Sequence, residues 1–142
     1  GQGSRAPQDA PRIAGTLRDN LAFPFAQRAG CRQEFDESTS GDLLQAVDLG
    51  RLPLDREVRT LSGGERHRLA LVRGLLWNPP VLVADEPLSG LDPEVAKQSF
   101  ELLLRYARRP GRLLLCALHD PELNVRADRR LRLADGSLRE IR

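Results

Sequence analysis

Two stretches decide the fold: Leu61-Ser62-Gly63-Gly64-Glu65 and Val81-Leu82-Val83-Ala84-Asp85-Glu86-Pro87. The first has the Ser-x-x-Glu spacing of a capping box, which predicts a helix start with unpaired backbone N–H groups that favour an anion. The second is a continuous apolar run ending in two carboxylates, which is typical of a buried parallel strand whose end can hold Mg²⁺. Together they indicate a site that binds phosphate and magnesium. Taken singly, each also fits a plainer reading, an ordinary capping box and a strand that ends in solvated acids.

The chain after the second stretch predicts a parallel strand–helix–strand unit. Asp92 and Pro93 can open a helix, whose apolar face recurs every three or four residues through residues 96–107. The run 113–117 predicts a second strand, and we expect both strands to be buried on both faces and joined by a right-handed crossover. Alternating residues around Asp135-Gly136 predict a terminal hairpin.

The chain before it reads as mostly helical. Thr16 can cap a short helix that Pro24 should end, residues 27–41 read as a loop, and residues 41–49 predict a second short helix. A third helix should run from Ser62 to about Trp77. The prediction is one α/β domain over 1–142, with a helical region over about 13–80. Its parallel-sheet core and C-terminal β-hairpin would occupy 81–142.

Composition excludes several classes of protein. A net charge of +2, with acids and bases interspersed, argues against a dedicated nucleic-acid binder. Two cysteines far apart and two histidines offer no zinc spacing. No apolar stretch approaches the length of a membrane span, and no signal-peptide pattern is present. We expect a soluble, intracellular protein that reaches a membrane only through a partner.

Three polar residues can carry chemistry at the carboxyl edge of the predicted sheet, and a fourth, Gln8, lies in the N-terminal segment. Asp85 can hold Mg²⁺, and Glu86 can orient or deprotonate an attacking water. His119 directly follows the second strand, so it should lie beside Glu86, where its imidazole can hydrogen-bond a phosphate. The Gln8 amide can bind a metal-bound water. Taken alone, His119 is better explained as a capping or surface histidine, and Gln8 as an ordinary loop residue.

These residues carry a resemblance to the ABC (ATP-binding cassette) ATPases. Leu61–Arg66 resembles their signature motif, Val81–Pro87 their Walker B strand and Ser89–Asp92 their D-loop. His119 resembles their switch histidine. The segment 7–9, followed by 15–21, is similar to their Q-loop and the stretch after it. The motifs keep the family's order and spacing, and the resemblance covers essentially the whole chain.

The resemblance implies a role for each matching residue. Asp85 would be a Mg²⁺ ligand, Glu86 the catalytic carboxylate and His119 a contact of the γ-phosphate of ATP. Gln8 would sense both metal and water. In this family two cassettes pair head to tail, and ATP closes the dimer. The remaining implied residues act across that dimer, as nucleotide contacts in the opposite subunit (Ser62, Gly63, Gly64, Glu65) or as D-loop contacts between subunits (Ser89, Asp92).

One expected feature of an ABC site does not occur in the sequence. The phosphate-binding loop G-x-x-x-x-G-K-[ST] requires a lysine, and Lys97, the only lysine, lies between Ala96 and Gln98 in a predicted helix. We therefore expect an incomplete P-loop NTPase, matching the C-terminal part of a cassette. We also expect negligible ATP binding by the isolated chain.

The resemblance leaves two main functional hypotheses. In the first, the chain is part of an ATPase subunit that couples ATP hydrolysis to transport through a transmembrane permease, at the cytoplasmic face of the cell membrane. Residues 15–21 look more like the exporter pattern than the importer one. In the second, it is a non-catalytic half-cassette that donates the signature motif to a complete partner. A DNA-repair or chromosome-organising ABC ATPase lacks support because no sustained heptads occur.

Overall fold

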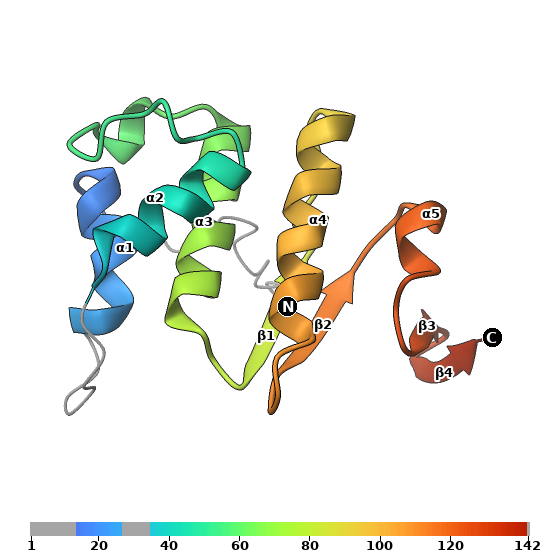
Figure 1. Cartoon of the computed structure of the whole chain (residues 1–142). Helices are drawn as coiled ribbons and strands as arrows, with labels where there is room; N and C mark the ends of the chain where they lie inside the picture. The colour runs from blue at the N-terminus through green and yellow to red at the C-terminus, as the bar shows by residue number, and fades with distance from the viewer. Residues whose placement is uncertain (1–13, 27–34, 142) are drawn as a thin grey trace, which may run out of the picture.

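The structure, a computed structural model, describes residues 14–26 and 35–141. Gln8 lies outside the described residues. In chain order the elements are α1 (Leu17–Ala26), α2 (Glu37–Ala46), the 3-10 turn η1 (Val58–Thr60), α3 (Gly63–Trp77), β1 (Val81–Asp85), α4 (Pro93–Ala107), β2 (Leu113–Ala117), α5 (Pro121–Asn124), β3 (Arg130–Ala134) and β4 (Ser137–Ile141). Figure 1 shows α1–α3 at one end, α4 over the β1–β2 pair, and the hairpin at the other end.

Side-chain caps explain where the helices begin. Thr16 and Asp19 exchange hydrogen bonds at the start of α1, because the Thr16 N–H donates to Asp19 at 2.8 Å and the Asp19 N–H donates to the Thr16 hydroxyl at 3.2 Å. Asp92 caps α4 by accepting from the Glu94 N–H at 3.1 Å. The predicted caps of both helices are confirmed.

Two predicted boundaries in the helical region are wrong. Pro24 does not end α1, which continues to Ala26; its ring is buried on the same face as Leu17 and Leu21, and this packing offsets the lost backbone hydrogen bond. The second helix starts at Glu37 rather than Gly41, because the Asp36 carboxylate accepts from the N–H groups of residues 38 and 39. The helix therefore replaces part of the predicted loop.

The core lies among α1, α2, α3 and α4. Leu17, Leu21, Val72 and Leu103 have no exposed surface. Tyr106 is almost fully buried as well, and its hydroxyl donates to the carbonyl of Pro79. The core thus joins the helical region to the strand–helix–strand unit, as aliphatic packing of amphipathic helices requires.

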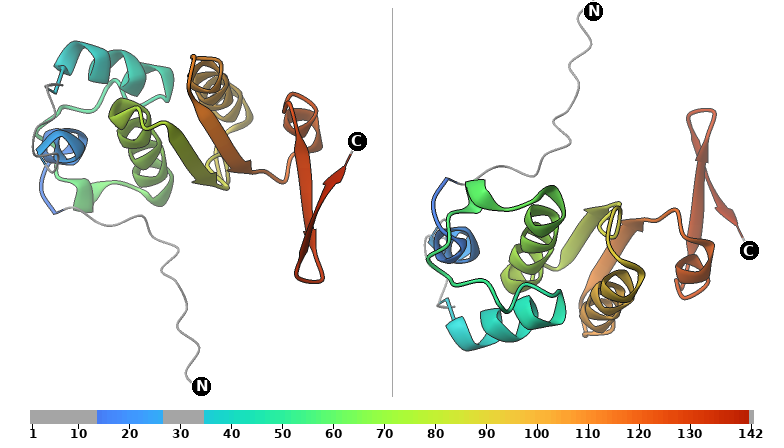
Figure 2. Two further views of the ribbon diagram at one scale, coloured as in Figure 1. Left: turned by 90° about the horizontal axis from the view of Figure 1, so that it is seen from below. Right: turned by 90° about the horizontal axis from the view of Figure 1, so that it is seen from above.

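Strands β1 and β2 are parallel, with Val81 opposite Leu113 and Asp85 opposite Ala117. The predicted parallel pair is therefore confirmed, but burial on both faces is wrong for the described part of the chain. Helices α3 and α4 cover one face (Figure 2), while Val83 and Leu115 on the other face are 67% and 52% exposed. A continuous apolar run could not show which face would be open, since both faces carry the same residue types.

The C-terminal strands β3 and β4 form the predicted antiparallel hairpin. Its two-residue turn is Asp135-Gly136, with φ of 50° and 71°, as a tight hairpin turn requires. Within the described part of the chain, no helix combines the length and the apolar character that a membrane span needs.

Candidate active site

Glu86 and His119 meet at the carboxyl end of the β1–β2 pair. Glu86 directly follows β1 and His119 lies two residues after β2, and the His119 Nε2 is 2.6 Å from the Glu86 Oε1. The parallel register produces this meeting, because parallel strands end at the same edge of their sheet. The structure thus brings together two side chains that are 33 positions apart in the sequence.

The backbone at Glu86 is unusual for a residue with a side chain. Its φ is +46°, in the left-handed region that costs an L-residue about 1–2 kcal/mol. Two hydrogen bonds hold it: its N–H donates to the Ala117 carbonyl at 3.1 Å, and its carbonyl accepts from the Ser89 N–H at 3.0 Å. Backbone strain of this kind concentrates at functional sites.

The contact between the two side chains adds little stability. The His119 side chain is 83% exposed and that of Glu86 is 46% exposed, and exposed ion pairs contribute little to folding. With Glu86 ionised, its Oε1 accepts a hydrogen bond from the N–H at His119 Nε2. The second carboxylate oxygen is then left to accept a proton from water. The geometry of the pair is therefore better explained by proton transfer than by a contribution to the stability of the fold.

Asp85 lies beside this pair, on the open face of the sheet. It alternates with Val81 and Val83 along β1, so its exposed carboxylate faces the same side. Among the described residues it forms no hydrogen bond or ion pair through that carboxylate. Its charge acts on Cys116, whose thiol pKa is raised to about 11, first by burial and then by Asp85. Asp85 thus presents a carboxylate that a cation can approach.

The glycine loop forms the start of α3, as predicted. The Ser62 N–H donates to the Glu65 Oε2 at 2.8 Å, and the Glu65 N–H donates to the Ser62 Oγ at 3.2 Å. This capping box leaves the N–H groups of Gly63 and Gly64 for solvent or a ligand, because first-turn N–H groups have no partner inside a helix. A Cβ atom at either glycine would meet nothing within 4 Å. The helix start is therefore open to a large anion.

Basic residues surround this helix start. Hydrogen bonding to the Ser62 N–H lowers the pKa of Glu65, with smaller contributions from the charges of Arg56 and Arg68. The Arg66 guanidinium donates to the Leu61 carbonyl. Neither Arg56 nor Arg68 belongs to a motif that the sequence displays. Their only sequence signal was the recurrence of arginine on either side of the glycine loop.

Ser89 and Asp92 occupy the turn between Glu86 and α4. Ser89 supports Glu86 through its backbone, as described above, and the Asp92 carboxylate caps α4. Gly90, with a φ of +69°, lets the chain turn between them. Both side chains are exposed in the turn that follows the strand.

The described residues divide the predicted site into two groups. Asp85, Glu86 and His119 share one edge of the sheet, whereas the Ser62–Glu65 group starts a different element. No hydrogen bond or ion pair joins the two groups in the part of the chain that the structure describes.

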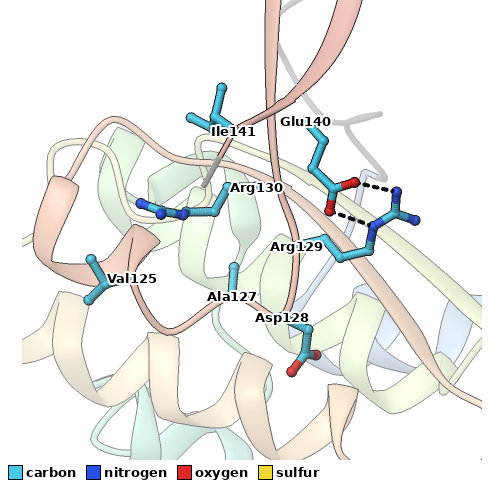
Figure 3. A pocket seen from close by; sticks show the side chains of 7 residues that line it. All are labelled: Val125, Ala127, Asp128, Arg129, Arg130, Glu140 and Ile141. Carbon is cyan, nitrogen blue, oxygen red and sulfur yellow. Dashed lines mark hydrogen bonds and ion pairs between the residues drawn. The ribbon is translucent and has the colours of Figure 1, made fainter.

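A hollow of about 490 Å³ lies elsewhere, between α5 and the hairpin. Figure 3 shows it, with Arg129 and Glu140 paired through two hydrogen bonds of 3.0 and 3.1 Å on one side. Arg130 and Val125 also line it. None of the predicted site residues does, so this hollow is separate from the candidate active site.

Taken together, the fold and the site define a class of α/β nucleotide-binding protein. The parallel strands end in carboxylates and a histidine, and a separate helical region carries an anion-accepting helix start. The family model "ABC transporter" matches residues 7–89, which is more than half of the chain. The chain belongs to the ABC transporter family.

Known relatives agree with this assignment. The lipoprotein-releasing system ATP-binding protein LolD of Bordetella avium is 50% identical, over 84% of this chain and 51% of that relative. LolD of Anaeromyxobacter dehalogenans is 38% identical, over 88% of this chain and 52% of that relative. The chain therefore spans about half the length of these curated relatives.

Solved structures show the same fold. A bacterial Atm1-family ABC exporter with ATP bound superposes with a TM-score of 0.72 at 27% identity, over 92% of this chain and 23% of that chain. A dimeric ATP-binding cassette in a post-hydrolysis state, bound to ADP and phosphate, gives a TM-score of 0.75 at 24% identity. That superposition covers 95% of this chain and 60% of the other. The predicted family and fold class are thus confirmed.

Proposed function

We propose that the chain provides catalytic residues of an ATP-hydrolysing subunit of an ABC transporter. The observation that carries the proposal is the 2.6 Å contact between Glu86 and His119 at the carboxyl edge of the parallel strands. Glu86 accepts a proton from the attacking water, and the N–H at His119 Nε2, which here donates to Glu86, would donate to the terminal phosphate once ATP is bound. Gln8, which lies outside the described residues, is proposed to contact the metal and the water.

The donor set at the sheet edge fits Mg²⁺ bound together with ATP. Mg²⁺ commonly uses one or two protein carboxylates, with waters and phosphate oxygens completing its octahedron. Asp85 offers one exposed, unpaired carboxylate, and no cluster of three potential ligands occurs among the described residues. Asp85 would therefore hold Mg²⁺ jointly with the phosphates. When bound, Mg²⁺ neutralises charge that develops on the phosphoryl oxygens.

The start of α3 is proposed to serve the nucleotide of an opposite subunit. The open N–H groups of Gly63 and Gly64 and the Ser62 hydroxyl would contact its γ-phosphate, with Glu65 holding Ser62 in place. The positive end of the α3 dipole strengthens such contacts. Ser89 and Asp92, exposed in the turn before α4, would lie between the paired subunits. ATP thus becomes the ligand that closes a head-to-tail dimer.

The partners follow from this role. We propose a second ABC ATPase subunit and a transmembrane permease, with the helical region over about 13–80 docking on the permease and 81–142 carrying hydrolysis. The chain would then sit at the cytoplasmic face of the cell membrane through that permease. An export function is favoured by residues 15–21 and by relatives named as a lipoprotein-releasing system.

The second candidate function is that of a non-catalytic half-cassette. It is favoured by one feature, the open start of α3, whose Gly63 and Gly64 N–H groups face no obstruction and need no contribution from Glu86 or His119. Such a chain would donate the Ser62–Gly64 helix start to a complete partner without binding nucleotide itself. In that case Glu86 and His119 would not contribute to hydrolysis.

A chimera separates the two functions. This chain replaces the matched half of the LolD protein of Bordetella avium, which supplies the rest of a cassette. ATP hydrolysis that depends on Glu86 and His119 supports the catalytic role. A chimera that binds ATP and hydrolyses it equally well with both residues replaced supports the half-cassette instead. The isolated chain should bind ATP negligibly because its sequence contains no G-x-x-x-x-G-K-[ST] loop. Binding at micromolar concentrations would contradict this expectation.

A further inference from the structure

The C-terminal hairpin carries three arginines on one face. Along β3, Arg130 and Arg132 alternate with leucines, and the register places Arg139 of β4 directly opposite Arg132. Because successive side chains in a strand point to opposite faces, the three arginines share one face, which we call the arginine face. The leucines of both strands lie on the other face. The hairpin is therefore amphipathic, with its positive charge collected on one side.

The charges of the arginine face are not compensated within the described structure. Arg132 and Arg139 are both exposed, and residues directly opposite in an antiparallel pair have Cβ atoms about 4.5–5.5 Å apart. Like charges in this arrangement destabilise a sheet. None of the three arginines forms a hydrogen bond or ion pair with another described residue. An anion bound on this face would relieve a repulsion that the hairpin itself leaves in place.

The acids at this end of the hairpin do not neutralise the arginine face. Arg129 donates two hydrogen bonds to Glu140, at 3.0 and 3.1 Å, and this hydrogen bonding lowers the pKa of Glu140. Glu140 is therefore already occupied. Asp128 is the other carboxylate that lines the neighbouring hollow, and Figure 3 shows it directed away from Arg130. An anion on the arginine face thus meets no competing carboxylate there.

The hollow between α5 and the hairpin adds a binding volume to this face. It measures about 490 Å³, which is the size of a small-molecule site. Arg130 lines it and is half-buried, and Figure 3 shows its guanidinium on the side of Val125, away from the Arg129–Glu140 pair. Val125 and Ile141 contribute apolar side chains to the lining. The hollow thus combines an unpaired guanidinium with apolar surface.

We propose that the hollow and the arginine face bind a small organic phosphate, a soluble phosphate monoester with an apolar substituent. The phosphate lies on the arginine face, since guanidinium groups match phosphate oxygens with paired N–H donors. The substituent packs in the hollow against Val125 and Ile141. Three positive charges on one face favour a dianionic phosphate over a carboxylate. The site uses none of the residues assigned to ATP hydrolysis, so it does not rest on the proposed function.

Titration of the full chain with phenyl phosphate, followed by two-dimensional amide NMR, tests this proposal. Phenyl phosphate supplies a dianionic phosphate and an apolar ring, and the amide signals of β3 and β4 report binding at the hairpin. The signals of Gly63 and Gly64 report separately on any phosphate at the start of α3. The test variant is Arg132→Gln/Arg139→Gln. It removes the like-charge pair, so its hairpin should be at least as stable as that of wild type.

The matched control is Arg105→Gln/Arg109→Gln, which makes the same charge change at the C-terminal end of α4. Both of these arginines are exposed, and their side chains form no hydrogen bond within the described residues. We expect the dissociation constant of phenyl phosphate to rise by about tenfold or more in the hairpin variant, and to stay within about twofold of wild type in the control. Benzoate, with a single charge, should bind about tenfold more weakly than phenyl phosphate.

Several results overturn the proposal. Signal changes confined to Gly63 and Gly64 place the phosphate elsewhere. Equal affinity in the hairpin variant removes the role of the arginine face, and benzoate binding as tightly as phenyl phosphate removes the preference for phosphate. Vesicles of phosphatidylglycerol that bind through Arg132 and Arg139, when phenyl phosphate does not bind, contradict a small soluble ligand and make this face a membrane contact instead.

Discussion

Replacing Gly64 by Ala separates a phosphate site from a plain helix start. A Cβ atom at Gly64 meets nothing within 4 Å, and the residue is the second of α3. Alanine is favoured over glycine in a helix by about 0.5–1 kcal/mol, so the free energy of unfolding should stay equal or rise by up to that amount. For a chain of this size the midpoint of thermal unfolding should rise by at most about 4 °C.

The same methyl group should impair nucleotide binding across the dimer. It occupies the space through which a phosphate oxygen reaches the N–H groups of Gly63 and Gly64. Loss of one charge-assisted hydrogen bond costs about 1.5–3 kcal/mol, which lowers the rate of ATP hydrolysis by roughly 10- to 150-fold. The assay combines thermal unfolding of the chain with ATP hydrolysis by the LolD chimera.

Gly41 provides the matched control for this experiment. It lies inside α2, and its Cβ position is equally open. Gly41→Ala should therefore stabilise the fold as Gly64→Ala does while leaving ATP hydrolysis unchanged. If Gly64→Ala hydrolyses ATP as fast as the unsubstituted chimera, the start of α3 is only a capped helix, and the reasoning about its open N–H groups is refuted.

Three further predictions concern the fold and its titrating groups. Leu103→Ala, at a site with no exposed surface, should lower the free energy of unfolding by about 2–5 kcal/mol in urea titration; a loss below about 1 kcal/mol contradicts the core assignment. The pKa of Glu65 is lowered in the fold, so its stabilisation is complete above its unfolded pKa and is lost as pH falls through the folded value. Glu65→Gln should thus flatten the pH dependence of unfolding below about pH 4.5, and an unchanged pH profile counts against the capping box. With Cys31 replaced by Ser, Cys116 should react with a disulfide reagent at pH 8 on the order of 100-fold slower than an ordinary thiol, because its pKa is about 11; modification at the ordinary rate shows that the thiol is not shielded.

Local chemistry made much of the fold predictable. The pairs Thr16–Asp19 and Ser62–Glu65 predict where their helices begin, because each pair satisfies backbone N–H groups that would otherwise be unpaired. The turn Asp135-Gly136 likewise specifies its hairpin. Asp36 carries the same kind of signal, but the polar residues around it read as a loop. The polar composition around Asp36 therefore predicted a loop, although Asp36 caps a helix.

Tertiary packing decided what the sequence could not show. The helix continues through Pro24 because its ring packs on the buried face of α1, and that face exists only in the folded core. The open face of β1 and β2 depends on which elements lie against the sheet, as Val83 shows. The meeting of Glu86 with His119 was predictable from strand order, whereas the left-handed backbone at Glu86 was not.

The central claim concerns Glu86 as the group that accepts the proton of the attacking water. Glu86→Gln keeps the shape of the side chain and its contact with His119 but removes the base, and His119→Ala removes the residue that orients it. In the LolD chimera, Glu86→Gln should retain ATP binding and lose hydrolysis by at least about 100-fold. ATP hydrolysis by Glu86→Gln at the rate of the unsubstituted chimera would contradict the account.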